Sequence, residues 1–122
     1  MIEFFLVVNR FGQTRVGQYY RRLPRAERRT LEAELVRKCL AREDSKCCVF
    51  AHTDYKIVFR RYVSLYFIIG ASHDEQNELA LYNFIQLFVE TLNRYFEKVC
   101  ELDIVTHSEK VHFVLDEMIQ NG

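Results

Sequence analysis

The sequence predicts an α+β fold, in which an antiparallel sheet packs against helices. Runs of β-branched and aromatic residues occur at the N-terminus and again in the middle of the chain. Segments with apolar residues at helical spacing follow each group of runs. The expected order is ββ-α-βββ-α-α, and strand runs interrupted by helices in this way favour an antiparallel sheet covered by helices.

The first half of the chain begins with two strands and a helix. Residues 2–9 (IEFFLVVN) are typical of a strand buried on both faces, and Gly12 can take the positive φ that turns the chain back. Residues 14–20 should then pair antiparallel with the first strand. Pro24 suits the start of a helix, because an N–H is not needed there. We expect this helix over 25–42, with an apolar face of Leu31, Leu35, Val36, Cys39 and Leu40.

Three further strands are predicted after this helix. Residues 47–53 (CCVFAHT) have the composition of a strand. The apolar run from Tyr55 to Ile69 is too long for one ordinary strand, so we expect a hairpin that turns near Arg60–Tyr62. In the polar segment that follows, Asp74 and Asn77 are candidate helix caps.

Two helices are expected at the end of the chain. The first has apolar residues three and four apart over more than five turns: Leu81, Phe84, Ile85, Phe88, Leu92, Tyr95, Phe96 and Val99. The second is expected over residues 108–120, with Ser108 as its cap and Gly122 as a candidate end. Its inward residues should be Val111, Val114, Leu115 and Met118.

Length and composition predict one domain in a reducing compartment. A chain of 122 residues is long enough for one domain only. Its 17 basic and 17 acidic side chains cancel, so no overall field favours nucleic acid as a partner. The N-terminal run is too short to span a bilayer and lacks the features of a signal peptide. We expect the four cysteines, Cys39, Cys47, Cys48 and Cys100, to be reduced thiols in apolar surroundings, and the chain to be cytoplasmic.

The sequence offers no convincing catalytic or metal-binding pattern. The glycines at 12, 17, 70 and 122 are isolated and form no phosphate-binding loop. The histidines and cysteines are not spaced as zinc ligands. Cys100 and His107 could form a nucleophile and its base, but His107 falls in a predicted loop and no oxyanion donor accompanies them. We therefore expect a scaffold or binding module, with no enzymatic activity and no cofactor.

A cationic cluster lies at the start of the first predicted helix. It consists of Arg21, Arg22, Arg25, Arg28 and Arg29. The favoured interpretation is a solvated face partly balanced by Glu27, Glu32 and Glu34. The alternative is contact with anionic lipid headgroups, where each cation contributes about 1 kcal/mol.

The segment IVFRRYVSLYF (57–67) resembles a signature of the small (σ) chains of adaptor protein complexes. The matching residues are Ile57, Val58, Arg60, Leu65, Tyr66 and Phe67, whereas Phe59 stands where tyrosine is usual. MIEFFLVVNRFGQTR at the start, FVETLNRYFEKVCELDI (88–104) and KVHFVLDEM (110–118) agree in order and spacing, so the resemblance spans the chain. GQTR, the tyrosines at 19–20 and LYNFI (81–85) are most similar to the small chains of type 4 complexes.

The resemblance implies a fold, partners and a location. It implies one longin-like domain over residues 1–122, a five-stranded antiparallel sheet flanked by helices, without the C-terminal helical segment usual in the family. It also implies a non-catalytic subunit that assembles with two large chains and one medium chain. Such complexes select transmembrane cargo on the cytosolic face of trans-Golgi network and endosomal membranes. The alternative is a stand-alone longin-type protein or a coatomer small chain.

The resemblance further implies a site for acidic dileucine sorting signals, shared with a large chain. Such a signal has an acidic residue, three variable residues, a leucine, and then leucine or isoleucine. Arg15 matches the residue that faces the acidic side chain, a charge-assisted contact. The residues that match the leucine pockets are Val63, Leu65, Val89, Val99 and Ile104, with Lys98 beside them. Burial of a leucine contributes about 1.5–3 kcal/mol.

Two departures from the family pattern bear on this site. Val63 replaces a smaller alanine, so its methyl groups narrow the expected pocket. VTHS (105–108) replaces an aromatic-containing segment. From the residues alone, an ordinary core or a subunit interface is the favoured interpretation of Val63, Leu65, Val89 and Val99.

Overall fold

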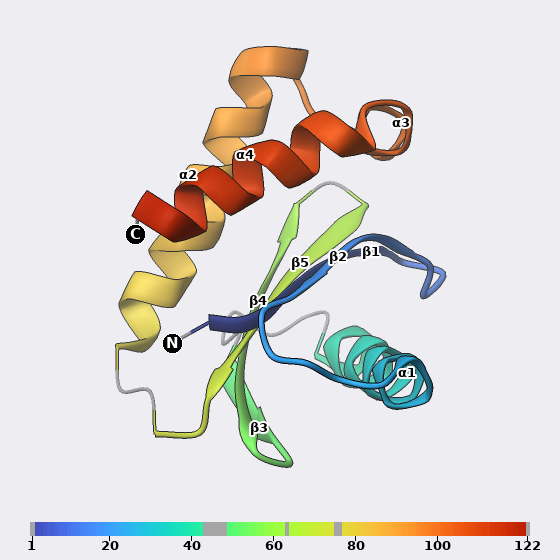
Figure 1. Cartoon of the computed structure of the whole chain (residues 1–122). Coiled ribbons are helices and arrows are strands. Elements are labelled where there is room, and N and C mark those ends of the chain that lie inside the picture. Colours follow the sequence, from blue (N-terminus) through green and yellow to red (C-terminus); the bar gives the residue numbers. More distant parts are fainter. Residues whose placement is uncertain (1, 43–48, 63, 75–76, 122) are drawn as a thin grey trace.

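A five-stranded antiparallel sheet forms the centre of the fold. The computed structural model describes residues 2–42, 49–62, 64–74 and 77–121. The strands are β1 (Ile2–Asn9), β2 (Thr14–Tyr19), β3 (Val49–His52), β4 (Tyr55–Tyr62) and β5 (Leu65–Ser72). They lie in the order β2-β1-β5-β4-β3, and every neighbouring pair is antiparallel (Figure 1). The predicted α+β class and sheet are confirmed.

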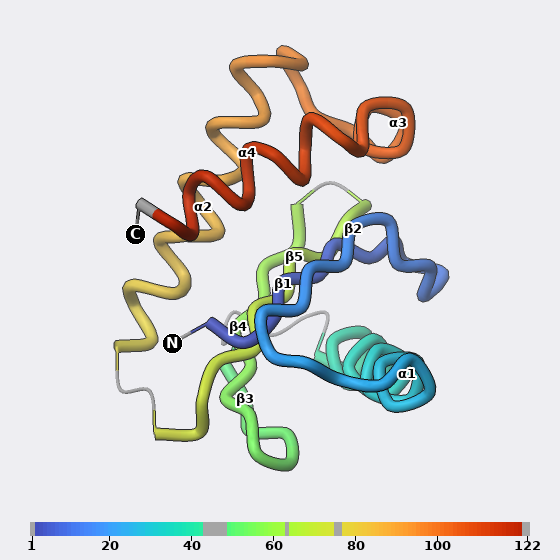
Figure 2. The backbone as a smooth tube through the Cα atoms, viewed as in Figure 1, coloured from blue at the N-terminus to red at the C-terminus, as the bar shows by residue number. Residues whose placement is uncertain are grey.

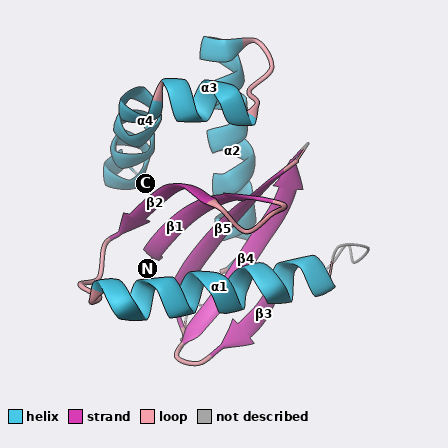
Figure 3. Ribbon diagram, turned by 90° about the vertical axis from the view of Figure 1, so that its right-hand side faces the viewer, coloured by secondary structure: helices cyan, strands magenta, loops and turns pink. Residues whose placement is uncertain are grey.

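Helices cover both faces of this sheet. They are α1 (Arg25–Ala41), α2 (Glu78–Phe96), α3 (Glu101–Thr106) and α4 (Ser108–Asn121). Figure 3 shows α1 crossing one face of the sheet, while the other three helices lie on the opposite side. The order is therefore ββ-α-βββ-α-α-α, with one helix more than predicted. Among the described residues, no helix has the length and apolar character needed to cross a membrane.

Helix α3 was missed because it spans only 6 residues. So short a segment has no readable apolar period, and an isolated helix of this length is unstable in water. Here Asp103 accepts a hydrogen bond from the backbone N–H of Cys100 at 3.1 Å, and Ile104 is fully buried in the core. Figure 2 shows the chain passing from α2 through α3, on the β2 side of the sheet, into α4.

Strand β1 separates two apolar cores, as its continuous hydrophobic run predicts. Alternate residues of a strand point to opposite faces. Phe4, Leu6 and Val8 belong to the core under α1, whereas Phe5 and Val7 belong to the core shared with α2 and α4. The predicted apolar faces of α1 and α4 enter these cores, although Leu40 and Met118 are only partly buried.

Helix α2 begins as predicted but differs from the prediction towards its C-terminal end. Asn77 is its cap, because its Oδ1 accepts a hydrogen bond from the backbone N–H of Ala80 at 3.1 Å, as predicted. Tyr95 is 53% exposed, so its predicted inward position is wrong. Its ring lies 4.1 Å from the Nζ of Lys110 instead. Val99 is buried as predicted but lies beyond the end of the helix.

The predicted hairpin is confirmed, because β4 pairs antiparallel with β5, but its turn was placed too early: Arg60, Arg61 and Tyr62 all lie inside β4. Arg60 pairs with Phe67 and Arg61 with Tyr66 across the hairpin, and β4 continues to Tyr62. The Arg60 guanidinium lies 5.8 Å from the ring centre of Tyr82 in α2. A strand can carry the two arginines because successive side chains point to opposite faces.

The cysteine prediction is confirmed at one position and wrong at another. Cys39 is fully buried against the sheet, whereas Cys100 is exposed. Cys47 and Cys48, which begin the predicted third strand, lie outside the described residues, as does Gly122.

Candidate functional site

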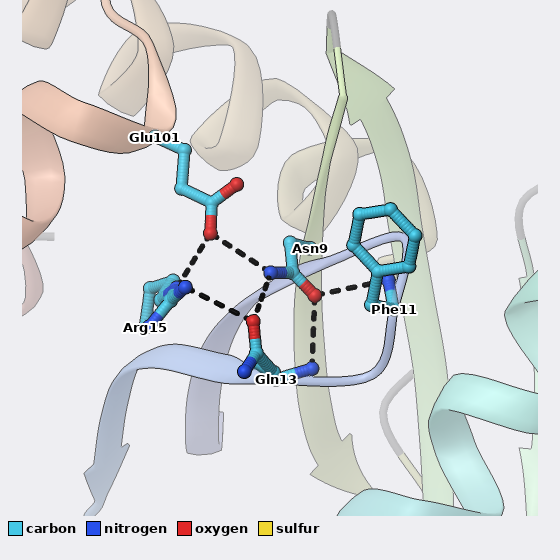
Figure 4. A network of polar contacts seen from close by, with 5 residues as sticks. All are labelled: Asn9, Phe11, Gln13, Arg15 and Glu101. Carbon is cyan, nitrogen blue, oxygen red and sulfur yellow. Dashed lines mark hydrogen bonds and ion pairs between the residues drawn. The ribbon is translucent and has the colours of Figure 1, made fainter.

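An ion pair joins the second strand to the short third helix. The Nε of Arg15 in β2 donates to Oε2 of Glu101, the first residue of α3, at 2.6 Å. The same oxygen accepts a hydrogen bond from Nδ2 of Asn9 at 2.8 Å (Figure 4). The fold thus brings Arg15, a predicted site residue, against a carboxylate far away in the sequence.

Gln13 and Asn9 complete this polar network. Oε1 of Gln13 accepts from Nη2 of Arg15 at 3.0 Å and from Nδ2 of Asn9 at 2.8 Å. Oδ1 of Asn9 accepts from the backbone N–H groups of Phe11 at 3.0 Å and Gln13 at 2.9 Å (Figure 4). Gly12 has φ of +86°, the positive value predicted for this turn. The β1–β2 turn and the network are therefore built from the same residues.

The network keeps Glu101 ionised. Its pKa lies below the ordinary value because Asn9 and then Arg15 donate hydrogen bonds to the charged form, and the charge of Arg15 adds to this effect. Partial removal from water acts in the opposite direction and is outweighed. The side chains of Arg15 and Glu101 are 31% and 27% exposed, so the pair lies at the surface.

The predicted pocket residues lie in the core of the chain. Leu65, Val89, Val99 and Ile104 are at most 2% exposed and belong to one apolar cluster with residues of α2 and α4. Their side chains are packed against neighbours and do not line an open surface in the isolated chain. Lys98 is exposed, and Val63 lies outside the described residues.

The connection between α2 and α3 is held by side-chain hydrogen bonds. Glu97 has φ of 62° and ψ of −67°, and the N–H of Lys98 bonds to the carbonyl of Phe96 at 2.7 Å. This is a γ-turn, a strained conformation for a residue other than glycine. Oδ1 of Asn93 accepts from the N–H of Val99 at 2.8 Å, and Nδ2 of Asn93 donates to the hydroxyl of Tyr62 at 3.1 Å.

Sequence reasoning missed four residues of this region. Asn9, Gln13, Asn93 and Glu101 were not singled out. Asn9 had a usable signal, because an asparagine that follows an apolar strand and precedes a turn often binds the backbone two residues further on. Glu101 had no local sequence signal, since its partner Arg15 is 86 residues away.

The predicted cationic cluster is mostly exposed. Arg21, Arg22, Arg25 and Arg29 are exposed at the start of α1. Arg28 is half-buried, with its Nε bonded to the carbonyl of Leu23 at 2.8 Å and its guanidinium 4.6 Å from the ring centre of Tyr19.

Two of the glutamates expected to balance these arginines bind other groups. Glu32 accepts hydrogen bonds from the hydroxyls of Thr14 and Tyr19, and Glu34 contacts Nε2 of His52 at 2.8 Å. Burial, followed by the bond to Glu32, raises the pKa of the Tyr19 hydroxyl.

The cysteine and histidine considered for catalysis have other contacts. Sγ of Cys100 donates to Oδ2 of Asp103 at 3.3 Å, and the ring centre of His107 lies 5.3 Å from that of Phe96. Within the described parts of the chain, no group of three or more histidine, cysteine or carboxylate side chains is arranged to hold a metal ion.

Comparison with known families identifies the chain. Residues 1–122 match the model of the family described as clathrin adaptor complex small chain. The chain belongs to this family. It is 57% identical over 121 residues to AP-4 complex subunit sigma from Arabidopsis thaliana, covering 99% of this chain and 84% of that protein. It is 44% identical over 122 residues to AP-4 complex subunit sigma-1 from Homo sapiens, covering 100% of this chain and 84% of that protein.

A structural comparison agrees with this assignment. The fold matches a chain in a structure described as a homology model of the full-length AP-3 complex in a stretched open conformation. The TM-score is 0.83 and the identity 26%, and the match covers 100% of this chain and 83% of that chain. The resemblance inferred from IVFRRYVSLYF and the type 4 details are thereby confirmed. The family consists of non-catalytic adaptor chains of vesicle transport, which confirms that the chain is not an enzyme.

Proposed function

We propose that the chain is the small subunit of a heterotetrameric, type 4 vesicle-coat adaptor, in which residues 1–122 form one longin-like domain. Its partners are two large chains and one medium chain, and the complex sorts transmembrane cargo on the cytosolic face of trans-Golgi network and endosomal membranes. The observation that carries this proposal is the match of the whole chain to the small-chain family, with AP-4 relatives at 57% and 44% identity.

The surface of the chain supports a role as a subunit. Leu79, Leu102 and Phe113 are each more than 60% exposed. A groove between α2 and α4 is lined by Phe84, Leu87, Thr91, Tyr95, Val114, Glu117 and Met118. A surface groove lined mainly by apolar side chains, like this one, is typical of contacts with other chains.

Affinity capture tests the assembly. The tagged chain, expressed in cells that contain the other adaptor chains, should recover two large chains and one medium chain in equal amounts. Recovery of coatomer chains would favour the alternative of a coatomer small chain. Recovery of the tagged chain alone would contradict the subunit role.

We also propose that the assembled complex binds acidic dileucine signals at the Arg15 site. Arg15 is at the surface, and its guanidinium is bound to a carboxylate, the group that an acidic signal residue would supply. Val99 and Ile104 flank Glu101 in the sequence and are buried with Leu65 and Val89. Because these four side chains are packed in the isolated chain, leucine binding needs a rearrangement that the large chain would support.

Peptide titration tests this second part of the proposal. Arg15→Ala in the assembled complex should weaken binding of an acidic dileucine peptide about tenfold, since a hydrogen bond to a charged group contributes about 1.5–3 kcal/mol. Arg29→Ala is the matched control, because Arg29 is an exposed arginine on α1 outside this network. Equal binding by the wild-type and Arg15→Ala complexes would remove Arg15 from the site.

Contact with anionic lipid is a second candidate role, for the cationic cluster. Four of its arginines, Arg21, Arg22, Arg25 and Arg29, are exposed at one end of α1. Their joint replacement by glutamine should reduce flotation of the complex with anionic vesicles but leave neutral vesicles unaffected. Equal flotation with both vesicle types would support the solvated-face interpretation instead.

A further inference from the structure

The charge of Arg15 is already bound by the chain itself. Oε2 of Glu101 receives the Nε–H of Arg15 at 2.6 Å, and Gln13 receives an Nη2–H at 3.0 Å. A carboxylate arriving from a peptide would meet a guanidinium whose Nε–H has an anionic partner. Glu101 thus occupies the Nε edge of the guanidinium, where it competes with the acidic residue of a signal for the charge of Arg15 (Figure 4).

We propose that Glu101 is an internal competitor for the acidic residue of a sorting signal, and that Arg15 becomes available only when Glu101 leaves it. This inference rests on the proposed signal-binding function and adds the step that controls access to the site. It assigns a role to a residue that is not among the expected binding residues.

Buried Asn9 holds Glu101 in the competing position. Asn9 is 2% exposed, so its amide has little access to water. Its oxygen is used by the turn, and its nitrogen donates to both Glu101 and Gln13. The lowered pKa of Glu101 means that the competitor is fully charged at neutral pH. The competing contact is therefore built into the β1–β2 turn and is not a chance meeting of two surface side chains.

The competitor lies on the same segment as two predicted pocket residues. Val99 precedes Glu101 by two positions, Ile104 follows it by three, and both are buried in one core with Leu65. The segment leaves α2 through the γ-turn at Glu97 and is held by Asn93. A shift of this backbone segment would therefore withdraw Glu101 from Arg15 and displace Val99 and Ile104 together. Exposure of the charge and opening of the apolar site are linked through this segment.

The competition has a consequence that a purely structural role would not have. In the wild-type complex, the acidic residue of a signal must replace the contact between Arg15 and Glu101, so part of the affinity that it gains from Arg15 is offset. Once Glu101 is neutral, the same residue adds a new contact. Removal of the charge on Glu101 should therefore strengthen binding, and only for peptides that carry the acidic residue.

The test uses the assembled adaptor complex and two fluorescent peptides. One peptide has Glu, three serines and two leucines, and the other has Gln in place of Glu. Fluorescence anisotropy compares wild type with Glu101→Gln. Glu109→Gln is the matched control, because Glu109 is exposed on the next helix and its replacement changes the net charge equally. We expect Glu101→Gln to bind the Glu peptide about fivefold more tightly, with the Gln peptide and the Glu109→Gln complex unchanged.

The outcomes separate this inference from the proposed function. The Glu peptide could bind in a way that depends on Arg15 but is unchanged or weaker in Glu101→Gln. This result would overturn the proposed role of Glu101 as a competitor and leave the proposed signal site intact. An equal gain for both peptides also overturns it. If the complexes assemble but neither binds the Glu peptide, signal binding and competition fail together. If Glu101→Gln impairs assembly, Glu101→Asp takes its place. Its shorter side chain should give a smaller gain in affinity, for the Glu peptide alone. The absence of any gain in affinity would contradict the proposal.

Discussion

Gly70 in β5 leaves the space that the ring of Phe4 occupies. A Cβ at Gly70 would lie 2.1 Å from Cε2 and Cζ of Phe4, its cross-strand partner in β1. Phe4 is 1% exposed, and its ring is held by an edge contact with Tyr55 at 5.2 Å between ring centres. The ring has little freedom to move, so any side chain at position 70 overpacks this core.

Replacement of Gly70 by alanine should therefore destabilise the chain strongly. We expect Gly70→Ala to lower the free energy of unfolding by about 3 kcal/mol, measured by urea denaturation. Gly17→Ala is the control, because a Cβ there has no neighbour nearer than 3.5 Å, and its change should stay within about 0.5 kcal/mol. Similar unfolding midpoints for the two variants would contradict this account of Gly70.

The ion pair of Glu101 predicts a pH-dependent stability. The pKa of Glu101 in the folded chain lies below the ordinary 4.5, so the ionised form stabilises the fold above 4.5, and this contribution is lost as the pH falls through the folded pKa. At neutral pH, Glu101→Gln should lower the free energy of unfolding by about 1 kcal/mol. Urea denaturation should show the difference between wild type and variant shrinking as the pH falls below 4.5. A difference that does not change with pH would argue against an ionised Glu101.

The start of helix α2 depends on one of two candidate caps. Asn77 accepts the hydrogen bond from the N–H of Ala80, whereas Asp74 is exposed before the helix. Asn77→Ala should lower the free energy of unfolding by about 1 kcal/mol because that N–H loses its partner. Asp74→Ala serves as the control and should change it by less than about 0.5 kcal/mol. Thermal and urea denaturation measure both, and equal losses would show that Asn77 has no special role.

At the scale of elements, prediction succeeded where an element carries its own pattern. The strand Ile2–Asn9, the inward face of α1 and, apart from Tyr95, that of α2 were correctly predicted. A continuous apolar run and a helical repeat can be recognised without knowing the neighbours. The hairpin turn was misplaced because no glycine or asparagine marks it, and the pairing of Arg60 with Phe67 is a property of two strands together. Helix α3 was not predicted for a similar reason, because its stability comes from tertiary contacts and not from a pattern of its own.

In the molecule as a whole, one sheet joins two cores that do not touch each other directly. Ile68 belongs to the core under α1, and Ile85 to the core with α2 and α4. Ile68→Val and Ile85→Val should each lower the free energy of unfolding by about 0.5–1.5 kcal/mol. Because the sheet separates them, the double variant should show the sum within about 0.5 kcal/mol. Circular dichroism and tyrosine fluorescence should report one unfolding transition, whereas two transitions would show that the cores unfold separately.

The α+β class, most of the strands and helices, and membership of the adaptor small-chain family can be recognised in the amino-acid sequence. These follow from local periodicity and turn chemistry, and from the block IVFRRYVSLYF with its companions along the chain. The group that Arg15 binds, and the places of the other predicted site residues, became visible only in the folded chain. The partner Glu101 is 86 residues away, and Leu65, Val89, Val99 and Ile104 are packed as core. Such contacts depend on how β2, α2 and α3 pack together, and no local pattern in the chain encodes that packing.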